Sequence, residues 1–158
     1  MKEIQLSRGM VALVDDEDFE SLNQYKWHAL QHRNTFYASR YSRVDSKQKY
    51  IRMHGEIMNG SGIDHIDHNG LNNQKSNLRF CTNSENAMNR IKMRNTSSIY
   101  KGVTFHKPNK KWMAQIKING NKTHIGMFTS EIEAAKAYNA KAIELFLEFA
   151  NLNIIPNE

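Results

Sequence analysis

The sequence has a single cysteine, Cys81, and lacks any long hydrophobic run. One cysteine excludes an internal disulfide, and it also excludes a thiolate zinc cluster, which needs two to four cysteines. A membrane span needs roughly 20 consecutive apolar residues, and no run approaches that length. The N-terminal residues show no apolar segment followed by a small-residue cleavage site, so secretion is not expected. These absences predict an intracellular protein that has no membrane partner and folds without a structural metal.

Charge is unevenly distributed along the chain. Residues 1–86 hold 11 Lys and Arg against 11 Asp and Glu, whereas residues 87–97 hold three basic residues and no acid. Residues 98–158 hold eight basic and five acidic residues, so the whole net charge of +6 lies beyond residue 86. This asymmetry favours a polyanionic partner. A merely solubilising surface would give the same charge, so composition alone leaves both interpretations open.

Short apolar runs separated by polar turns predict a β-rich first segment. Strands are expected at 10–14, 27–30, 36–41 and 50–53, and one or two turns of helix at 54–58. The acidic run that begins at Asp15 suits a helix N-terminus. The aromatic residues of this segment are expected to supply its core: Phe19, Tyr25, Trp27, Phe36, Tyr37 and Tyr41.

The pattern changes after residue 97. Apolar residues alternate in 112–118, which places one set on a single face of a strand. Asn119-Gly120 is typical of a hairpin turn, and Ser130 with Glu133 forms a capping box that opens a helix. The stretch 89–97, with Arg90, Lys92 and Arg94, is predicted to be a basic linker. The predicted organisation is a first domain at 1–88, this linker, and a second domain at 98–158.

The segment between Ile63 and Asn89 is rich in Asp, His and Asn, a composition poor at building a core. Phosphodiester hydrolysis needs a base, a divalent cation and a group that orients the base. Aspartate and amide oxygens suit Mg²⁺ or Mn²⁺, and an imidazole titrates near neutral pH. Neighbouring residues of a regular strand point to opposite faces, so a bend or bulge is expected at Asp64 and His65.

A resemblance to the HNH signature of phage and intron-encoded homing endonucleases is carried by residues 64–86, DHIDHNGLNNQKSNLRFCTNSEN. The resemblance implies a ββα-metal fold, with two strands and a helix around one cation. It implies that Asp64 and Asn86 are metal ligands and that His65 is the general base. It also implies that Asn77 orients the imidazole from the facing strand.

The resemblance has two departures. His68 stands where glycine is commoner, and Gly55 follows His54 where arginine is usual. If that arginine contacts phosphate, this contact is absent here. The sequence leaves His54 open between a packed and a functional residue. It also leaves Arg79 open between a DNA phosphate contact and an ion pair.

Residues 98–153 resemble the AP2 domain, the three-stranded sheet plus helix of plant transcription factors. The matching segments are YKGV (100–103), KWMAQIKING (111–120), Gly126 to Phe128, EIEAAKAYNAKA (131–142) and 150–153. In that family the sheet enters the major groove. The resemblance therefore places DNA contacts at Lys101, Thr104, His106, Gln115, Lys117, Lys122 and His124. Several of these positions hold arginine in plant members, so the plant sequence preference is not carried over.

The expected fold class is α+β: a ββα-metal nuclease core with a β-rich N-terminal region, then a small three-stranded antiparallel sheet plus one helix. The expected function is site-preferring, homing-type cleavage of double-stranded DNA, one strand per event, with one Mg²⁺ or Mn²⁺ per site. The protein is expected to act as a monomer or homodimer, in a bacterial host cytoplasm if phage-encoded. Two alternatives stay open: a non-catalytic AP2-type regulator with a vestigial HNH region, and a structural or packaging-associated phage protein that binds DNA without sequence preference.

Overall fold

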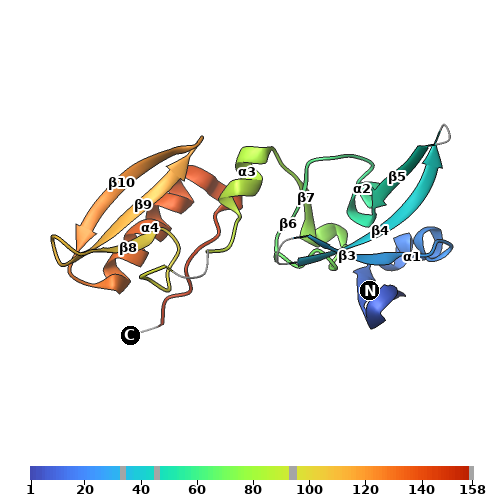
Figure 1. Cartoon of the computed structure of the whole chain (residues 1–158), viewed down its shortest axis with the longest axis horizontal. Coiled ribbons are helices and arrows are strands. Elements are labelled where there is room, and N and C mark those ends of the chain that lie inside the picture. Colours follow the sequence, from blue (N-terminus) through green and yellow to red (C-terminus); the bar gives the residue numbers. More distant parts are fainter. Residues whose placement is uncertain (33–34, 45–46, 93–95, 157–158) are drawn as a thin grey trace. The chain divides into compact units, whose positions relative to one another are not determined.

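The computed structural model describes residues 1–32, 35–44, 47–92 and 96–156. They form two units, Met1–Thr82 and Asn83–Glu158. Small antiparallel sheets and short helices make up both units, which confirms the expected mixed α+β class (Figure 1). In the described ranges no helix is both long enough and apolar enough to cross a bilayer. Arg94 of the predicted linker lies outside the described residues.

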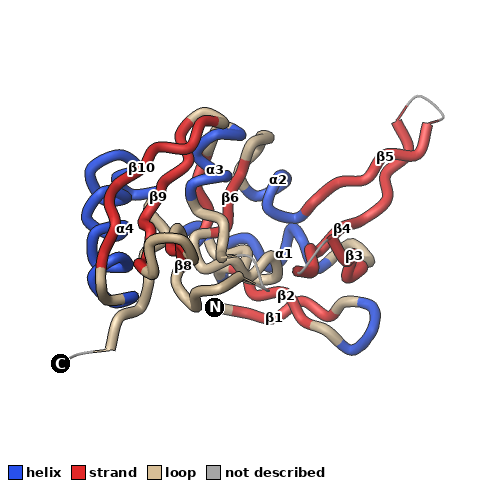
Figure 2. Tube along the Cα trace, turned by 60° about the vertical axis from the view of Figure 1, so that its left-hand side comes forward, coloured by secondary structure: helices blue, strands red, loops and turns tan. Residues whose placement is uncertain are grey.

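The first unit is built from strand pairs and short helices, shown in red and blue in Figure 2. Its sheets, in pairing order, are β1 (Lys2–Gln5) with β2 (Val11–Val14), β3 (His28–His32) with β4 (Thr35–Val44) and β5 (Lys47–Arg52), and β6 (Ile63–His65) with β7 (Leu78–Phe80). The helical segments are η1 (Ser7–Gly9), α1 (Asp16–Asn23), α2 (Met53–Ile57) and η2 (Lys75–Asn77). The strands expected near residues 10, 27, 36 and 50 are all present, and β1 is an addition.

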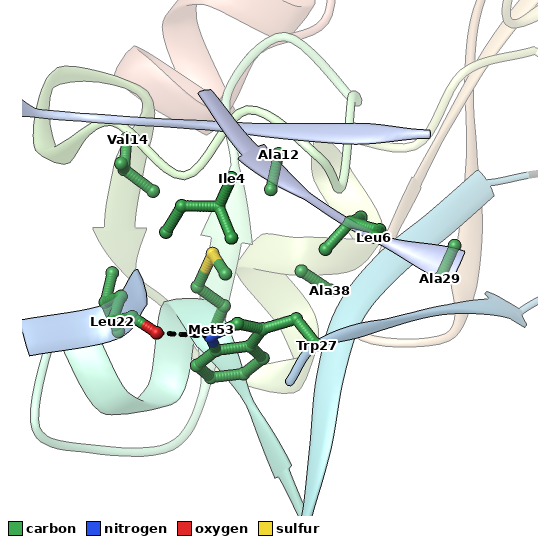
Figure 3. Close-up of a cluster of buried hydrophobic side chains, with 9 residues drawn as sticks. All are labelled: Ile4, Leu6, Ala12, Val14, Leu22, Trp27, Ala29, Ala38 and Met53. Atoms are coloured by element: carbon green, nitrogen blue, oxygen red, sulfur yellow. Dashed lines mark hydrogen bonds between the residues drawn. The ribbon is translucent and has the colours of Figure 1, made fainter. Parts of the chain in front are cut away.

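The core of the first unit surrounds Trp27, which is 1% exposed and donates its indole N–H to the Leu22 carbonyl at 2.8 Å (Figure 3). Ile4, Val14 and Met53 pack in the same cluster, so this core joins the β1–β2 hairpin to α1 and α2. Leu71, from the segment that links β6 and β7, also packs against this cluster.

The expectation that every aromatic residue of this segment lies in the core was wrong for two of them. Tyr25 and Tyr41 are exposed. The guanidinium of Arg40 lies 3.9 Å from the ring centroid of Tyr25, and the ring of Tyr41 lies 4.5 Å from that of Tyr50. Both tyrosines therefore pack against surface side chains, which the alternation of polar and apolar residues does not reveal.

The second unit is a three-stranded sheet packed on one helix, as expected (Figure 1). Its elements are α3 (Asn83–Met88), β8 (Val103–His106), β9 (Lys111–Ile118), β10 (Asn121–Phe128), α4 (Glu131–Phe146) and η3 (Leu147–Phe149). Ala114 and Ile116 of β9 are buried against the apolar face of α4. The capping box of Ser130 and Glu133 is present at the start of α4.

The division between the units falls between Thr82 and Asn83. The sequence predicted a boundary after residue 88, which would leave α3 with the first unit. The structure groups α3 with the second unit, whose Lys101 and Asn151 donate hydrogen bonds to the carbonyls of Met88 and Asn89. The boundary after residue 88 stays a prediction. The grouping of α3 matters for the candidate site, since α3 carries Asn86.

We expect any side chain at position 102 to destabilise the second unit. The φ of Gly102 is +75°, and a Cβ there would lie 2.1 Å from Tyr138 Cδ2 and 2.7 Å from the Gln115 carbonyl oxygen. Gly102→Ala should therefore lower the free energy of unfolding by about 3 kcal/mol, through overpacking and backbone strain together. Urea unfolding followed through the NMR amide signals of β8–β10 measures this loss.

Gly120→Ala is the matched control for Gly102→Ala. Its φ is +87°, but nothing lies within 4 Å of the added Cβ. That variant should lose only about 1–2 kcal/mol, the cost of left-handed backbone alone. Equal losses in the two variants would contradict the packing described for Gly102 and Tyr138.

Candidate active site and nucleic-acid interface

The candidate active site begins with the β6–β7 pair, two strands of three residues each. Asp64 lies opposite Arg79, and His65 lies opposite Leu78. Arg79 donates from Nη2 and Nε to Oδ2 of Asp64 at 2.9 and 3.2 Å. The side chains of Arg79 and Asp64 are 14% and 8% exposed, so the guanidinium compensates a buried carboxylate. Of the two roles left open for Arg79, the structure shows the ion pair, and the phosphate contact stays a prediction.

The expectation of a bend or bulge at Asp64 and His65 was wrong: β6 is regular through both residues, so their side chains point to opposite faces, and the chain turns only after His65. Pairing between β6 and β7 is regular as far as His65, without a bulge. Ile66 and Asp67 then form a turn, in which the amide of His68 donates to the His65 carbonyl at 3.1 Å. His68 has φ of +65°, a left-handed conformation that glycine adopts without strain. The turn therefore explains why glycine is commoner at this position in the HNH signature.

Asn77 fixes the loop that links the two strands. Its Nδ2 donates to Asp67 Oδ1 at 2.9 Å and to the Asn72 carbonyl at 2.8 Å, and its Oδ1 accepts from the Asp67 amide. Burial would raise the pKa of Asp67, but hydrogen bonds from Asn72, Asn69 and Asn77 outweigh it and lower that pKa. These bonds hold the turn after His65. The orienting role predicted for Asn77 stays a prediction, since its side-chain bonds go to Asp67 and Asn72.

The side-chain amide of Asn73 lies beside the imidazole of His65. It is fully buried, and its Oδ1 lies 3.4 Å from His65 Nε2. Its Nδ2 donates to the Leu71 carbonyl, so the amide oxygen is the atom turned toward His65. An acceptor at Nε2 favours the tautomer that carries its proton there and its lone pair on Nδ1. The main-chain N–H of Asn73 donates to the Leu13 carbonyl, which connects this loop to β2.

The imidazole of His65 is surrounded by other rings. The rings of His54 and Tyr37 lie 4.9 and 5.6 Å from it, centroid to centroid. Burial lowers the pKa of His65, against the opposing effects of Asn73, Asp67 and Asp64. His65 is therefore held neutral at neutral pH, the form in which an imidazole accepts a proton.

The pKa of His54 is lowered more strongly than that of His65. Burial, then the charges of His65 and Arg52, lower the pKa of His54 to about 3. Its Nδ1 has no hydrogen-bond partner among the described residues. The structure thus shows His54 as a packed residue against the candidate base. Arg52, exposed at the end of β5, lies over the Tyr37 ring at 4.9 Å.

Asn86, the second predicted metal ligand, lies on α3 of the second unit with its side chain exposed. Among the described residues, no three His, Cys, Asp or Glu side chains gather into a group that could hold a metal ion. The predicted donor set is one carboxylate and one amide oxygen. It fits Mg²⁺ by chemistry, because this ion prefers hard oxygen donors and keeps several waters. That Asn86 joins Asp64 at a cation stays a prediction.

The second unit offers a candidate nucleic-acid interface on its sheet. In β9, Ala114 and Ile116 face α4. The residues that alternate with them therefore face away from α4, and these are Lys111, Met113, Gln115 and Lys117. Direct cross-strand partners share a face, and the pairs here are Lys122 with Lys117, His124 with Gln115, Thr104 with Met113, and His106 with Lys111. The predicted contacts on the face opposite α4 are therefore Thr104, His106, Gln115, Lys117, Lys122 and His124. Residues 98–130 contain six lysines and no Asp or Glu, so this face has no acidic side chain.

Lys101 is separate from that face. It precedes β8, is half-buried, and donates from Nζ to the Met88 carbonyl at 2.6 Å. The DNA contact predicted for Lys101 stays a prediction, and the structure shows its ammonium bound to the end of α3.

Four neighbours of His65 were not assigned to the site from the sequence: Tyr37, Arg52, His54 and Asn73. A signal existed for two of them, since His54 lies in the IRMH segment and Asn73 lies in the HNH-like string. Tyr37 and Arg52 come from β4 and β5, and no local pattern links those strands to residue 65.

Comparisons with known proteins bear on this site. A family model described as HNH endonuclease matches residues 50–88. The chain is similar to "Uncharacterized HNH endonuclease L560" of Acanthamoeba polyphaga mimivirus, 34% identical over 153 residues that cover 94% of this chain and 77% of that protein. It is also similar to Protein 3.8 of Escherichia phage T7, 33% identical over 73 residues, or 46% of this chain and 60% of that protein.

A second likeness concerns a shorter stretch. The AP2-like ethylene-responsive transcription factor PLT2 of Arabidopsis thaliana is 41% identical over 63 residues, or 39% of this chain and 10% of that protein. No solved structure matches the chain. Both resemblances seen in the sequence, to the HNH signature and to the AP2 domain, are thus confirmed.

The low pKa of His54 makes the stability of the first unit depend on pH. The unfolded histidine titrates near its ordinary pKa of 6.5 and the folded one at about 3. Between these values only the unfolded chain takes up the proton, so stability falls as pH falls through this window, by about 1.4 kcal/mol per pH unit. His54→Phe keeps a ring and removes that proton uptake. Urea unfolding at pH 6, 5 and 4 should show a shallower decline for the variant, and an unchanged slope would contradict the buried, neutral His54.

Proposed function

Because this chain belongs to the HNH endonuclease family, we propose that it hydrolyses phosphodiester bonds of double-stranded DNA at preferred sites, one strand per event. The observation that carries the proposal is a buried imidazole, His65, next to a buried carboxylate, Asp64, on one short strand. Ends with 5′-phosphate and 3′-hydroxyl groups are the expected products.

In this mechanism His65 is the general base. Its lowered pKa leaves a lone pair at neutral pH, and the Asn73 oxygen near Nε2 directs that lone pair to Nδ1. Nδ1 takes a proton from water, the water oxygen bonds to phosphorus, and the bond from phosphorus to the 3′ oxygen breaks. The turn held by Asn77 and Asp67 fixes the backbone after His65 and so limits movement of the imidazole away from the attacking water.

Asp64 and Asn86 would hold the Mg²⁺ or Mn²⁺ ion. When bound, such an ion neutralises phosphate charge and stabilises the leaving oxygen. Arg79 keeps the Asp64 carboxylate in place on β6. Arg52 is a candidate phosphate contact, since its exposed guanidinium acts electrostatically on His65. It would take the place of the arginine that usually stands at position 55, where this chain has glycine.

The face of the β8–β10 sheet opposite α4 would bind the duplex. Its lysines, Lys117 and Lys122, suit phosphate contacts, and Gln115 suits a base edge. The acid-free stretch 98–130 supports this assignment, because nothing on the face repels phosphate. Such binding would favour certain sites.

Supercoiled plasmid with Mg²⁺ tests the nuclease. The wild type should convert it to open circles, and His65→Ala should lose about 10²–10⁴-fold in rate, as expected for a general base. His32→Ala, a substitution of an exposed histidine at the end of β3, is the control and should cut at the wild-type rate. Uncut plasmid with both wild type and His65→Ala, across varied sequence contexts, would refute the enzymatic proposal. Tight specific binding in EDTA without nicking would then favour the regulator.

The salt dependence of DNA affinity tests the sheet face. Each lysine that neutralises a phosphate contributes about 0.9 to the slope of log K against log salt. Replacing both Lys117 and Lys122 by Gln should therefore reduce the slope by about 2. Fluorescence anisotropy with a labelled duplex at several salt concentrations measures it. The control is Lys141→Gln on α4, where the ammonium pairs with Glu144, and a loss there equal to that of the double variant would argue against the sheet face.

A further inference from the structure

Helix α3 is too short to be stable by itself. It has six residues, and none of them is buried. Ser84 and Met88 lie one turn apart on the same side of α3, and both contact the second unit: Ser84 Oγ donates to Asn119 Oδ1 at 3.1 Å, and Met88 packs against the cluster of Ile116 and Tyr138. Asn86 lies halfway between them in sequence, so it projects from the opposite side and is exposed.

The end of α3 is held by two side chains of the second unit. Lys101 Nζ donates to the Met88 carbonyl at 2.6 Å, and Asn151 Nδ2 donates to the Asn89 carbonyl at 3.1 Å. The last carbonyls of a helix lack intrahelical partners, and a cation there also complements the helix dipole. Lys101 is partly buried where its ammonium meets α3, and this burial lowers its pKa to about 8.

Lys101 is itself fixed from both sides of its backbone. Its amide donates to Asn153 Oδ1 at 2.6 Å, and its carbonyl accepts from Asn153 Nδ2 at 3.1 Å. The backbone of Asn153 is held in turn by Asn139 of α4, at 2.8 and 2.9 Å. An unbroken series of hydrogen bonds therefore runs from α4, which supports the sheet, to the last turn of α3.

We propose that Lys101 is a positioning residue, which locks α3 to the sheet-and-helix unit so that the DNA-binding unit presents Asn86 outward as a metal ligand. This inference rests on the proposed function, in which Asn86 binds the cation. It reassigns Lys101 from contacting DNA to fixing a helix. It also makes binding of the duplex and placement of a catalytic ligand properties of the same rigid unit.

The test compares Lys101→Met, Asn151→Ala and the control Lys141→Met in the full chain. Amide hydrogen exchange at residues 86–89 should be about tenfold faster or more in the first two variants, because a charged or buried hydrogen bond is lost. Mn²⁺ affinity, followed by electron paramagnetic resonance, should fall about tenfold, since α3 is docked for a smaller fraction of the time. DNA affinity and its salt slope should not change. Lys141→Met should match wild type in every readout.

Two results would overturn the proposal. Unchanged exchange in α3, with a salt slope for DNA lower by about 1 in Lys101→Met, would make Lys101 a phosphate contact. Faster exchange without any loss of Mn²⁺ affinity would show that docking of α3 does not position Asn86. If Lys101→Met does not fold, Asn151→Ala decides, because it removes no charge. Since none of these readouts is nicking, a wild type that leaves plasmid uncut would refute the proposed function alone.

Discussion

The ion pair between Asp64 and Arg79 is the interaction on which the candidate active site depends. A carboxylate buried without its cation would be costly, and the two residues meet because β6 and β7 place them directly opposite each other. The same register puts His65 at the end of β6, where Asn73 and the rings of His54 and Tyr37 surround it. A strand pair of three residues on each side thus brings a buried carboxylate and a buried imidazole to adjacent positions.

Much of this arrangement could be predicted from the sequence, because it is encoded locally. The resemblance of residues 64–86 to the HNH signature implied two strands at this place, and the structure has β6 and β7 there. The second unit could be predicted for the same reason. Alternation in β9, the Asn119-Gly120 turn and the Ser130–Glu133 capping box each concern residues close in sequence.

The rest depends on contacts between distant residues. The ring of Tyr37, from β4, packs near the ring of His65. Asn139 accepts a hydrogen bond from the Asn153 amide, and Asn153 in turn accepts one from the Lys101 amide. Nor could the sequence show that Lys101 is half-buried and bonded to the Met88 carbonyl at the end of α3, whereas Lys117 is exposed. Tyr25 and Tyr41 were placed in the core for a similar reason: an aromatic residue packs as well on a guanidinium or another ring at the surface.

The central proposal is that Asp64 and Asn86 bind one divalent cation. Paramagnetic broadening of amide NMR signals by substoichiometric Mn²⁺ tests it most directly, because the effect falls steeply with distance from the ion. The account predicts that signals of β6 around Asp64 and signals of α3 around Asn86 broaden together, at the same Mn²⁺ concentration, and that Mg²⁺ competes for both. Broadening of one segment without the other, or of neither, would contradict the account.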